Sequence, residues 1–428
     1  MESGFNSPEY KRSRRAYMAQ ATFEYFVTLL VADAFLAKLL TSLGISDALT
    51  GIISSFISLA FVFQLFSLFL VKTKISTKKN VMFYDSLSIF LFMILFLVPF
   101  FPVGAEFKKV LVILCVIFAY ASKYVISSIC FKWANSYVEP SLRAVYSANK
   151  EIVSLLSGIV FTAVFGYVVD KFESIGNLDG AFLFIAVSIF VLNVLNFISL
   201  KMIKDETAEV QSESALSMKE VIQNTFVNKN FRNVIFMECV WKFAVYFTIG
   251  FIGVYKTNDL AISLFVIQII NIAGNFARMI LSRPFANYSD KRSFARGLEL
   301  GIWIAALAFF VNVFTAKTTW WLIVAHTLLY NISAAGTNQN SFNIAYSYVP
   351  LSCITQAISL KNCIGGLCGF FASIIGGVVL GVIQENGVVL FGININAQQI
   401  LSAVSFLLLV FVALFIHFVI AKQKVKIQ

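Results

Sequence analysis

The chain has 428 residues, of which 59% are hydrophobic and only 13% are charged. Its mean hydropathy of +0.83 exceeds what a water-soluble domain can bury, so composition excludes a soluble enzyme and predicts an integral membrane protein. The net charge of +11 does not indicate nucleic-acid binding, because the basic residues are concentrated between apolar segments, where they set membrane topology.

Apolar windows of about 20 residues, the length that spans a bilayer, occur twelve times. The predicted fold is all-α, with an N-terminal six-helix bundle over residues 1–203, a cytoplasmic linker over 204–232 and a C-terminal six-helix bundle over 233–428. Residues 1–15 are expected to form a basic tail. The first six helices are predicted at about 16–40, 49–71, 81–101, 107–133, 150–169 and 181–203.

The linker starts acidic and becomes amphipathic, with apolar residues at helical spacing between Met218 and Phe226. We interpret it as a surface helix joining the two bundles. The second six helices are predicted at about 234–255, 260–281, 297–315, 320–346, 361–383 and 398–421. All six prolines fall at predicted helix ends or in loops, as expected for a residue that breaks helix interiors. They are Pro8, Pro99, Pro102, Pro140, Pro284 and Pro350.

Charge and cysteine patterns give the orientation and the chemistry to expect. With a cytoplasmic N-terminus, nearly all Lys and Arg clusters lie inside, so the positive-inside rule predicts that both termini are cytoplasmic. The six cysteines lack metal or redox spacing, and we expect no cofactor and no metal.

The two halves are related by an internal repeat. Ten residues between Phe131 and Gly166 are identical to the residues 211 positions later, among them Lys150, which matches Lys361. Asp47 meets Asp259 at a similar offset, at the turn after the first helix of each half. A parallel repeat of six helices is an architecture of secondary transporters.

The segment Ala286–Ser293, with the sequence Ala-Asn-Tyr-Ser-Asp-Lys-Arg-Ser, resembles the Gly-x-x-x-Asp-Arg/Lys-x-Gly loop of the major facilitator superfamily. Ala286 and Ser293 replace the two glycines, and the first half has no aspartate in its corresponding loop. The resemblance implies a conformational latch formed by Asp290, with Lys291 beside it and Arg283 as a partner. A turn that serves only membrane topology is the alternative.

The resemblance also implies that helices 1, 4, 7 and 10 line a central cavity. Polar residues in these segments support this reading, because hydrocarbon would penalise them if they faced lipid. On helices 4, 7, 8 and 10 we predict that solute binds to Tyr120, Lys123, Tyr124, Ser127, Lys242, Tyr246, Asn271, Asn275, His326, Tyr330, Ser333, Thr337 and Asn340.

Three acidic residues are candidates for proton coupling. Glu24 and Asp33 are nine residues apart on helix 1 and therefore point to opposite sides. We favour Glu24 as the cavity residue and Asp33 as an interhelical partner or outer gate. Glu238 precedes Lys242 by one helical turn, and Lys123 and Lys242 are within reach of Glu24 and Glu238. A structural ion pair is the alternative for each charge.

The sequence therefore predicts a monomeric secondary transporter, not an enzyme, in the cytoplasmic membrane of a bacterium. A sugar or glycoside taken up with a proton is the first interpretation, because neutral donors and acceptors bind hydroxyl groups. An organic anion is the alternative, because of Lys123, Lys242 and Arg278. Drug efflux is the third interpretation, and a membrane scaffold or sensor without transport is the hypothesis from a different class.

Overall fold

The computed structural model describes residues 7–66, 77–139, 143–205, 228–349, 354–390 and 393–423. These residues divide between two compact units, unit 1 from within 1–45 and 63–215, and unit 2 from within 46–62 and 216–428. The predicted amphipathic linker helix lies outside the described residues. Residues 46–62, which we assigned to the first bundle, belong to unit 2 because they pack there: Ser58 Oγ donates a 2.8 Å hydrogen bond to the carbonyl of Gly366.

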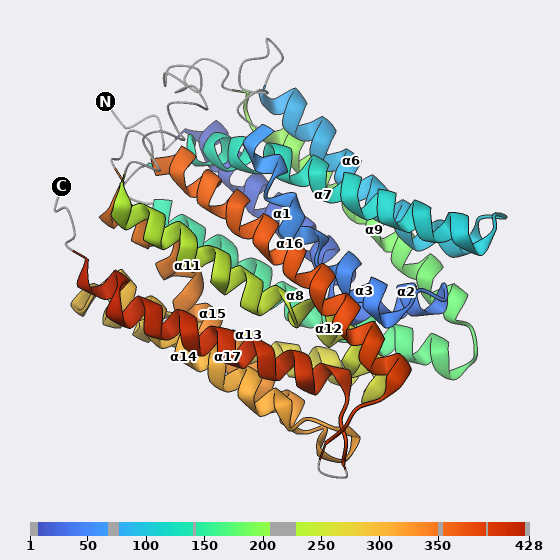
Figure 1. Ribbon diagram of the computed structural model, residues 1–428. Coiled ribbons are helices and arrows are strands. Elements are labelled where there is room, and N and C mark those ends of the chain that lie inside the picture. The colour runs from blue at the N-terminus through green and yellow to red at the C-terminus, as the bar shows by residue number, and fades with distance from the viewer. Residues whose placement is uncertain are drawn as a thin grey trace. The chain divides into compact units, whose positions relative to one another are not determined.

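Unit 1 is a group of long helices that pack side by side (Figure 1). Its first helix starts at Pro8, where the Ser7 hydroxyl accepts a hydrogen bond from the amide of Tyr10 and proline suits the first turn. Helix α6 packs against α7 and α9, and α1 packs against α8 and α9. The elements are α1 (Pro8–Leu30), α2 (Asp33–Ser42), η2 (Phe63–Phe66), α6 (Thr77–Leu97), η3 (Val98–Phe100), α7 (Ala105–Asn135), α8 (Arg143–Ser174) and α9 (Leu178–Met202).

Unit 2 holds a larger set of helices and a short hairpin (Figure 1). Helix α14 packs against α15 and α17, α11 packs against α16, and α3 packs against α12 and α16. The elements are α3 (Asp47–Ser54), α4 (Phe56–Ala60), α11 (Lys229–Tyr246), α12 (Ile249–Val254), η5 (Tyr255–Asp259), α13 (Leu264–Lys291), α14 (Phe294–Val313), η6 (Lys317–Thr319), α15 (Leu322–Asn343), η7 (Ile344–Ser347), α16 (Ile354–Asn386), β1 (Val389–Leu390), β2 (Ile393–Asn394), α17 (Ala397–Phe418) and η9 (Ile420–Lys422).

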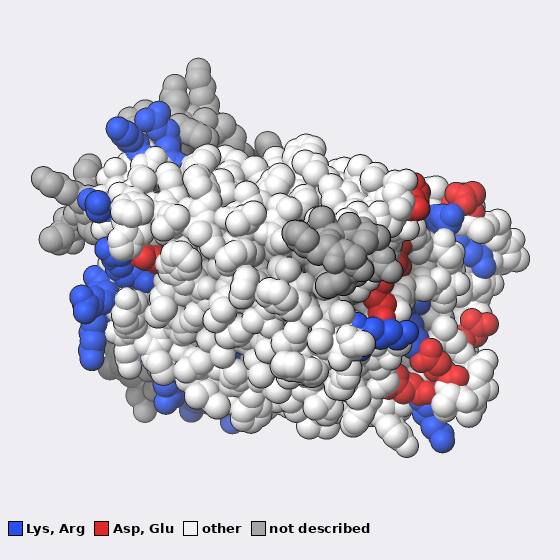
Figure 2. Space-filling model, turned by 60° about the horizontal axis from the view of Figure 1, so that its bottom comes forward, with Lys and Arg blue, Asp and Glu red and all other residues white. Residues whose placement is uncertain are grey.

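Nine helical segments among the described residues are long and apolar enough to cross a membrane. The predicted segments 16–40, 49–71 and 320–346 are not among these nine. The first is divided into α1 and α2, the described part of the second, up to residue 66, forms short helices, and the third is rich in polar residues. On the face shown in Figure 2, most of the surface is uncharged.

Two predicted helices are interrupted. The first predicted helix breaks at Val31–Ala32, and α2 then begins at Asp33, whose φ of 47° is in the left-handed region. The seventh breaks at Thr248, whose hydroxyl lies 2.6 Å from that of Ser405. Hydroxyl groups often satisfy the backbone atoms that a broken membrane helix frees.

Several predicted boundaries were wrong. Pro284 lies inside α13, which continues to Lys291, so the expected loop after helix 8 is helical up to that residue. Helix α8 extends beyond the predicted span at both ends, from Arg143 to Ser174. The antiparallel hairpin of β1 and β2 was not expected in an all-α chain.

Candidate functional site

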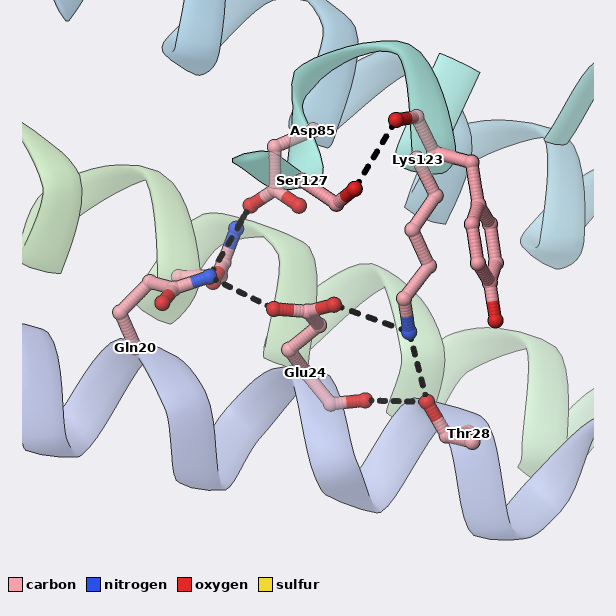
Figure 3. Close-up of polar contacts among 8 residues, drawn as sticks. Gln20, Glu24, Thr28, Asp85, Lys123 and Ser127 are labelled. Carbon is pink, nitrogen blue, oxygen red and sulfur yellow. Dashed lines mark hydrogen bonds and ion pairs between the residues drawn. The ribbon is translucent and has the colours of Figure 1, made fainter. Parts of the chain in front are cut away.

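Unit 1 contains a cluster of polar side chains that converge from four helices (Figure 3). Gln20, Glu24 and Thr28 are spaced by four residues on α1 and therefore share one helix face. Glu24 Oε1 lies 2.9 Å from Lys123 Nζ of α7, and the same ammonium donates a 3.0 Å hydrogen bond to Thr28 Oγ1. The predicted pairing of Glu24 with Lys123 is therefore present in the structure, and it joins α1 to α7.

The ion pair keeps limited access to solvent. The side chain of Lys123 is 22% exposed and that of Glu24 is 26% exposed. A pair in such surroundings is screened less than a surface pair. Water can therefore reach it.

Asp85, on α6, extends this cluster on its buried side (Figure 3). Its residue exposure is only 3%. Asp85 Oδ2 accepts hydrogen bonds from Asn196 Nδ2 of α9 at 2.6 Å and from Gln20 Nε2 at 3.4 Å. Gln20 Nε2 also donates to Glu24 Oε2 at 3.0 Å, so one amide group bridges the two carboxylates.

The other candidates on α7 have contacts within unit 1. Tyr120 is buried, and its ring meets that of Phe92 edge-on with the centroids 5.1 Å apart. Ser127 Oγ donates to the carbonyl of Tyr124 at 3.0 Å. Tyr124 and Ser127 are half-buried, so they remain better placed than Tyr120 to meet a solute.

Unit 2 contains a second carboxylate cluster, in which Glu238 of α11 pairs with Lys361 of α16. Their side chains are 3.2 Å apart and only 3% and 1% exposed. Ser341 of α15 donates a 2.8 Å hydrogen bond to Glu238 Oε2 and accepts one of 2.9 Å from Lys361. This cluster is more enclosed than the one in unit 1.

Lys242 does not pair with Glu238, although it follows it by one helical turn. Its ammonium lies over the rings of Phe61 and Tyr246, 5.4 and 5.8 Å from the centroids. Such cation–π contacts stabilise a lysine without neutralising its charge. Within the described part of the chain, Lys242 has no carboxylate partner.

The polar face of α15 packs against α14. His326 is buried, and its Nδ1 lies 3.0 Å from the carbonyl of Ala308. Thr337 and Asn340 donate to carbonyls of their own helix, and a Cβ at Gly301 or Gly297 of α14 would meet their side chains. Ser333 is 1% exposed. This face therefore has a packing role in the structure, and solute binding by His326, Ser333, Thr337 and Asn340 stays a prediction.

The remaining solute candidates are more accessible. Tyr330 of α15 is half-buried, with its ring edge-on to Phe309 at 5.9 Å between centroids. Asn271 and Asn275 of α13 are half-buried as well. Tyr246, at the end of α11, is half-buried beneath Lys242.

Asp33 lies at the start of α2 rather than inside a helix. Lys38, one turn further along, forms an ion pair with Glu173 of α8. An aspartate in the first turn is stabilised by the helix dipole. The position of Asp33 therefore suits a structural role, and proton coupling by Asp33 stays a prediction.

The latch candidates lie in the last three turns of α13. Arg283, Asp290 and Lys291 are exposed. Within the described residues none of the three side chains makes a hydrogen bond or an ion pair. The neighbouring turn is held by Ser289, which is buried and donates to the carbonyl of Phe285.

Unit 2 also has a pocket of about 190 Å³ at the end where α3, α12 and α16 meet. Asp47 lines it and accepts hydrogen bonds from Asn258 at 2.8 Å and from Gln384 at 3.0 Å. Asp259, which the repeat matches to Asp47, lines the same pocket. Asp47 therefore links α3 to the ends of two other helical segments.

Comparison with known proteins identifies the family. The sequence model of the Major Facilitator Superfamily matches residues 17–373. The chain belongs to this superfamily. Similar solved structures include the nucleoside transporter NupG (14% identity, 98% of this chain and 100% of that chain, TM-score 0.69) and the D-xylose-proton symporter (12% identity, 96% and 99%, TM-score 0.69). The POT family transporter PepTSo is similar as well (13% identity, 96% and 98%, TM-score 0.70).

At these identities the likeness to solved structures concerns the fold alone. No curated protein matches the sequence significantly. Membership of the Major Facilitator Superfamily identifies the chain as a multi-pass membrane transporter and not as an enzyme.

Two residues at the centre of these clusters, Asp85 and Lys361, were not predicted as site residues from the sequence. Asp85 is the lone acidic residue in the third apolar window, and a lone charge in such a window is itself a signal of function. Lys361 was found as the repeat partner of Lys150, but we interpreted it as the start of a helix. In the structure α16 begins earlier, at Ile354, and this places Lys361 within the helix.

Proposed function

We propose that the protein imports a small polar solute together with a proton by alternating access, with Glu24 as the proton carrier. The ion pair of Glu24 and Lys123 carries this proposal, because it joins two helices and keeps about a quarter of each side chain accessible. When a conformational change separates such a pair, the carboxylate loses its cation and favours the protonated form. Proton binding and helix movement are then coupled.

A sugar or glycoside is the substrate that we propose first. Half-buried neutral groups such as Tyr124, Asn271, Asn275 and Tyr330 can donate and accept hydrogen bonds, as hydroxyl-rich molecules require. Two proteins of similar fold are named a D-xylose-proton symporter and a nucleoside transporter, and a nucleoside is itself a glycoside. These names support testing sugars and nucleosides before other solutes.

An organic anion is the second candidate, and Lys242 favours it. Lys242 is half-buried with its ammonium over two aromatic rings, and among the described residues its one nearby carboxylate, Glu238, is already paired with Lys361. A carboxylate or phosphate on a solute would complete the ion pair. Efflux of amphipathic drugs is the third candidate, and the buried charges of both units count against it. A scaffold or sensor would show no solute flux.

We further propose that the chain works as a monomer in the cytoplasmic membrane of a bacterium, with both termini inside. The clusters of Lys and Arg between apolar segments support this orientation.

Flux measurements in proteoliposomes test the function. Labelled sugars, nucleosides, carboxylates and amino acids would be offered with and without an imposed pH gradient. We expect accumulation of one hydroxyl-rich solute that follows the pH gradient. Glu24→Gln should abolish gradient-driven accumulation but spare exchange of solute between equal pools, because exchange does not require the proton to be released.

Glu106→Gln is the matched control. Glu106 is also a glutamate paired with a lysine, Lys109, but its side chain is 86% exposed, and exposed pairs contribute little. This variant should transport like the unaltered protein. Accumulation by Glu24→Gln that still follows the pH gradient would exclude Glu24 as the carrier, and absence of flux for every solute would favour the scaffold.

A further inference from the structure

The cluster around Glu24 contains one more carboxylate than its ion pair can neutralise. Lys123 is paired with Glu24, and Asp85 has no ion-pair partner within the described residues. Asp85 is 3% exposed. Burying an ionised carboxylate without a cation is unfavourable, so this arrangement favours one additional proton.

Charged and titratable groups face Asp85 from every helix around it. Glu24 and Tyr17 lie on α1, Lys123 and Cys130 on α7, and Lys150 of α8 is directed to the Tyr17 ring, 5.1 Å from its centroid. Helix α9 contributes the neutral amide of Asn196. Lys123 is close enough to interact with Asp85 through its charge, but among the described residues the hydrogen bonds to the Asp85 carboxylate come from the two neutral amides of Gln20 and Asn196.

Asn196 has the geometry of a partner for a neutral carboxyl group. Its Nδ2 lies 2.6 Å from Asp85 Oδ2, a separation more usual between two oxygens than between nitrogen and oxygen. Its residue exposure is 0%, and among the described residues its Oδ1 has no hydrogen-bond partner. If the amide turns over, Oδ1 takes the place of Nδ2 and can accept a hydrogen bond from a protonated Asp85.

We propose that Asp85 is a proton-binding site. While Glu24 and Lys123 form their ion pair, the Asp85 carboxyl group holds a proton and through it donates a hydrogen bond to Asn196 Oδ1. When Asp85 is ionised, the Asn196 and Gln20 amides both donate to it. Gln20 also donates to Glu24, so the charge of one carboxylate affects the other through a single amide group.

A proton fits this site better than a metal cation. The Gln20 amide presents an N–H bond to Asp85, and an N–H group repels a metal ion. Among the described residues no group of three or more His, Cys, Asp or Glu side chains could hold a metal. The role of this proton in transport rests on the proposed coupling, but its binding does not.

The difference between the infrared spectra of the purified protein and of a purified variant measures the proton directly. At neutral pH we expect a carbonyl stretching band of a protonated carboxyl group that is lost in Asp85→Asn. The band should remain in Asp179→Asn, which removes an exposed aspartate from the first turn of α9. A band that survives Asp85→Asn, or that is lost in Glu24→Gln alone, overturns the proposal.

A second measurement needs no variant. A hydrophobic carbodiimide reacts with protonated carboxyl groups, so peptide mass spectrometry should find Asp85 modified, and less so as the pH is raised. The proposal is overturned if Asp85 stays unmodified at every pH. It is also overturned if Na⁺, compared with choline at constant pH and ionic strength, protects Asp85 from modification. Neither measurement involves flux, so the proposal and the proposed function can fail separately.

Discussion

Glu238 and Lys361, which are 123 residues apart in sequence, form an ion pair that is almost completely enclosed in unit 2. The shared contact with Ser341 fixes both side chains. Desolvating two charges is expensive, and the pair offsets this only while both partners are present. The enclosed position distinguishes Glu238 from Glu24 and favours a structural role for it.

Removing one partner of this pair should therefore destabilise the protein. We expect Glu238→Gln or Lys361→Met alone to cost about 3–5 kcal/mol, because each leaves a buried charge unpaired. The double variant Glu238→Gln/Lys361→Met should recover most of that loss. Thermal unfolding of the purified variants in detergent measures the effect. If the double variant is as unstable as the sum of the two single variants, the two residues are not coupled.

Two substitutions of Asp33 can test the role of its backbone conformation separately from the role of its charge. Its φ of 47° costs about 1–2 kcal/mol for most residues, and asparagine tolerates it better than others do. We expect Asp33→Asn to keep both stability and pH-dependent accumulation, whereas Asp33→Val should lower the unfolding temperature. Loss of pH-dependent accumulation in a stable Asp33→Asn variant would instead show that the carboxylate takes part in coupling.

The contact between α3 and α16 can be locked covalently. A Cβ added at Gly381 would lie 4.0 Å from the Cβ of Ala48, within the range of about 3.5–4.5 Å for disulfides. Oxidised Ala48→Cys/Gly381→Cys should lose transport and regain it on reduction, because α3 comes from the first sequence repeat and α16 from the second, and alternating access moves one repeat against the other. Each single variant, oxidised in the same way, controls for the natural cysteines. Undiminished transport with the disulfide formed would show that α3 and α16 stay together throughout the cycle.

The latch proposed for Asp290 can be tested through the difference between rate and affinity. Asp290 is exposed at the end of α13, about four turns after Asn275, and at ~1.5 Å per residue this is about 22 Å along the helix. Asp290→Asn should slow transport several-fold and leave solute affinity within a few-fold. Binding and flux assays on one preparation compare the two. Equal losses of affinity and flux would count against a latch.

Much of the fold could be predicted because the bilayer imposes a length on each helix. The positions of the long helices follow from apolar windows alone, as for α9, predicted at 181–203 and found at Leu178–Met202. The break at Val31–Ala32 has no glycine or proline nearby to announce it, and the break at Thr248 has only Gly250, two residues later. Pro284 led to the opposite error, because we predicted a helix end there and it lies inside α13.

The candidate site was harder to predict, because helical period gives a face but not its neighbour. The polar stripe of α15 has the predicted period, yet His326 and Thr337 meet α14. Glu238 and Lys242 have favourable spacing on one helix, yet it is Lys361, on another helix, that forms the ion pair with Glu238. Only the tertiary fold decides which of several possible partners a charge has.

The pairing of Glu24 with Lys123 also has a consequence for biosynthesis. Lys123 is translated 99 residues after Glu24, and at about 5–20 residues per second the interval is roughly 5–20 s. During that time the first segment carries an acidic group with no counter-ion, a burden of about 2.5–3.5 kcal/mol for a charge at a helix centre. Stable insertion of the N-terminal segment therefore waits for α7 to leave the ribosome, and nascent chains cut before Lys123 should expose that segment to proteases.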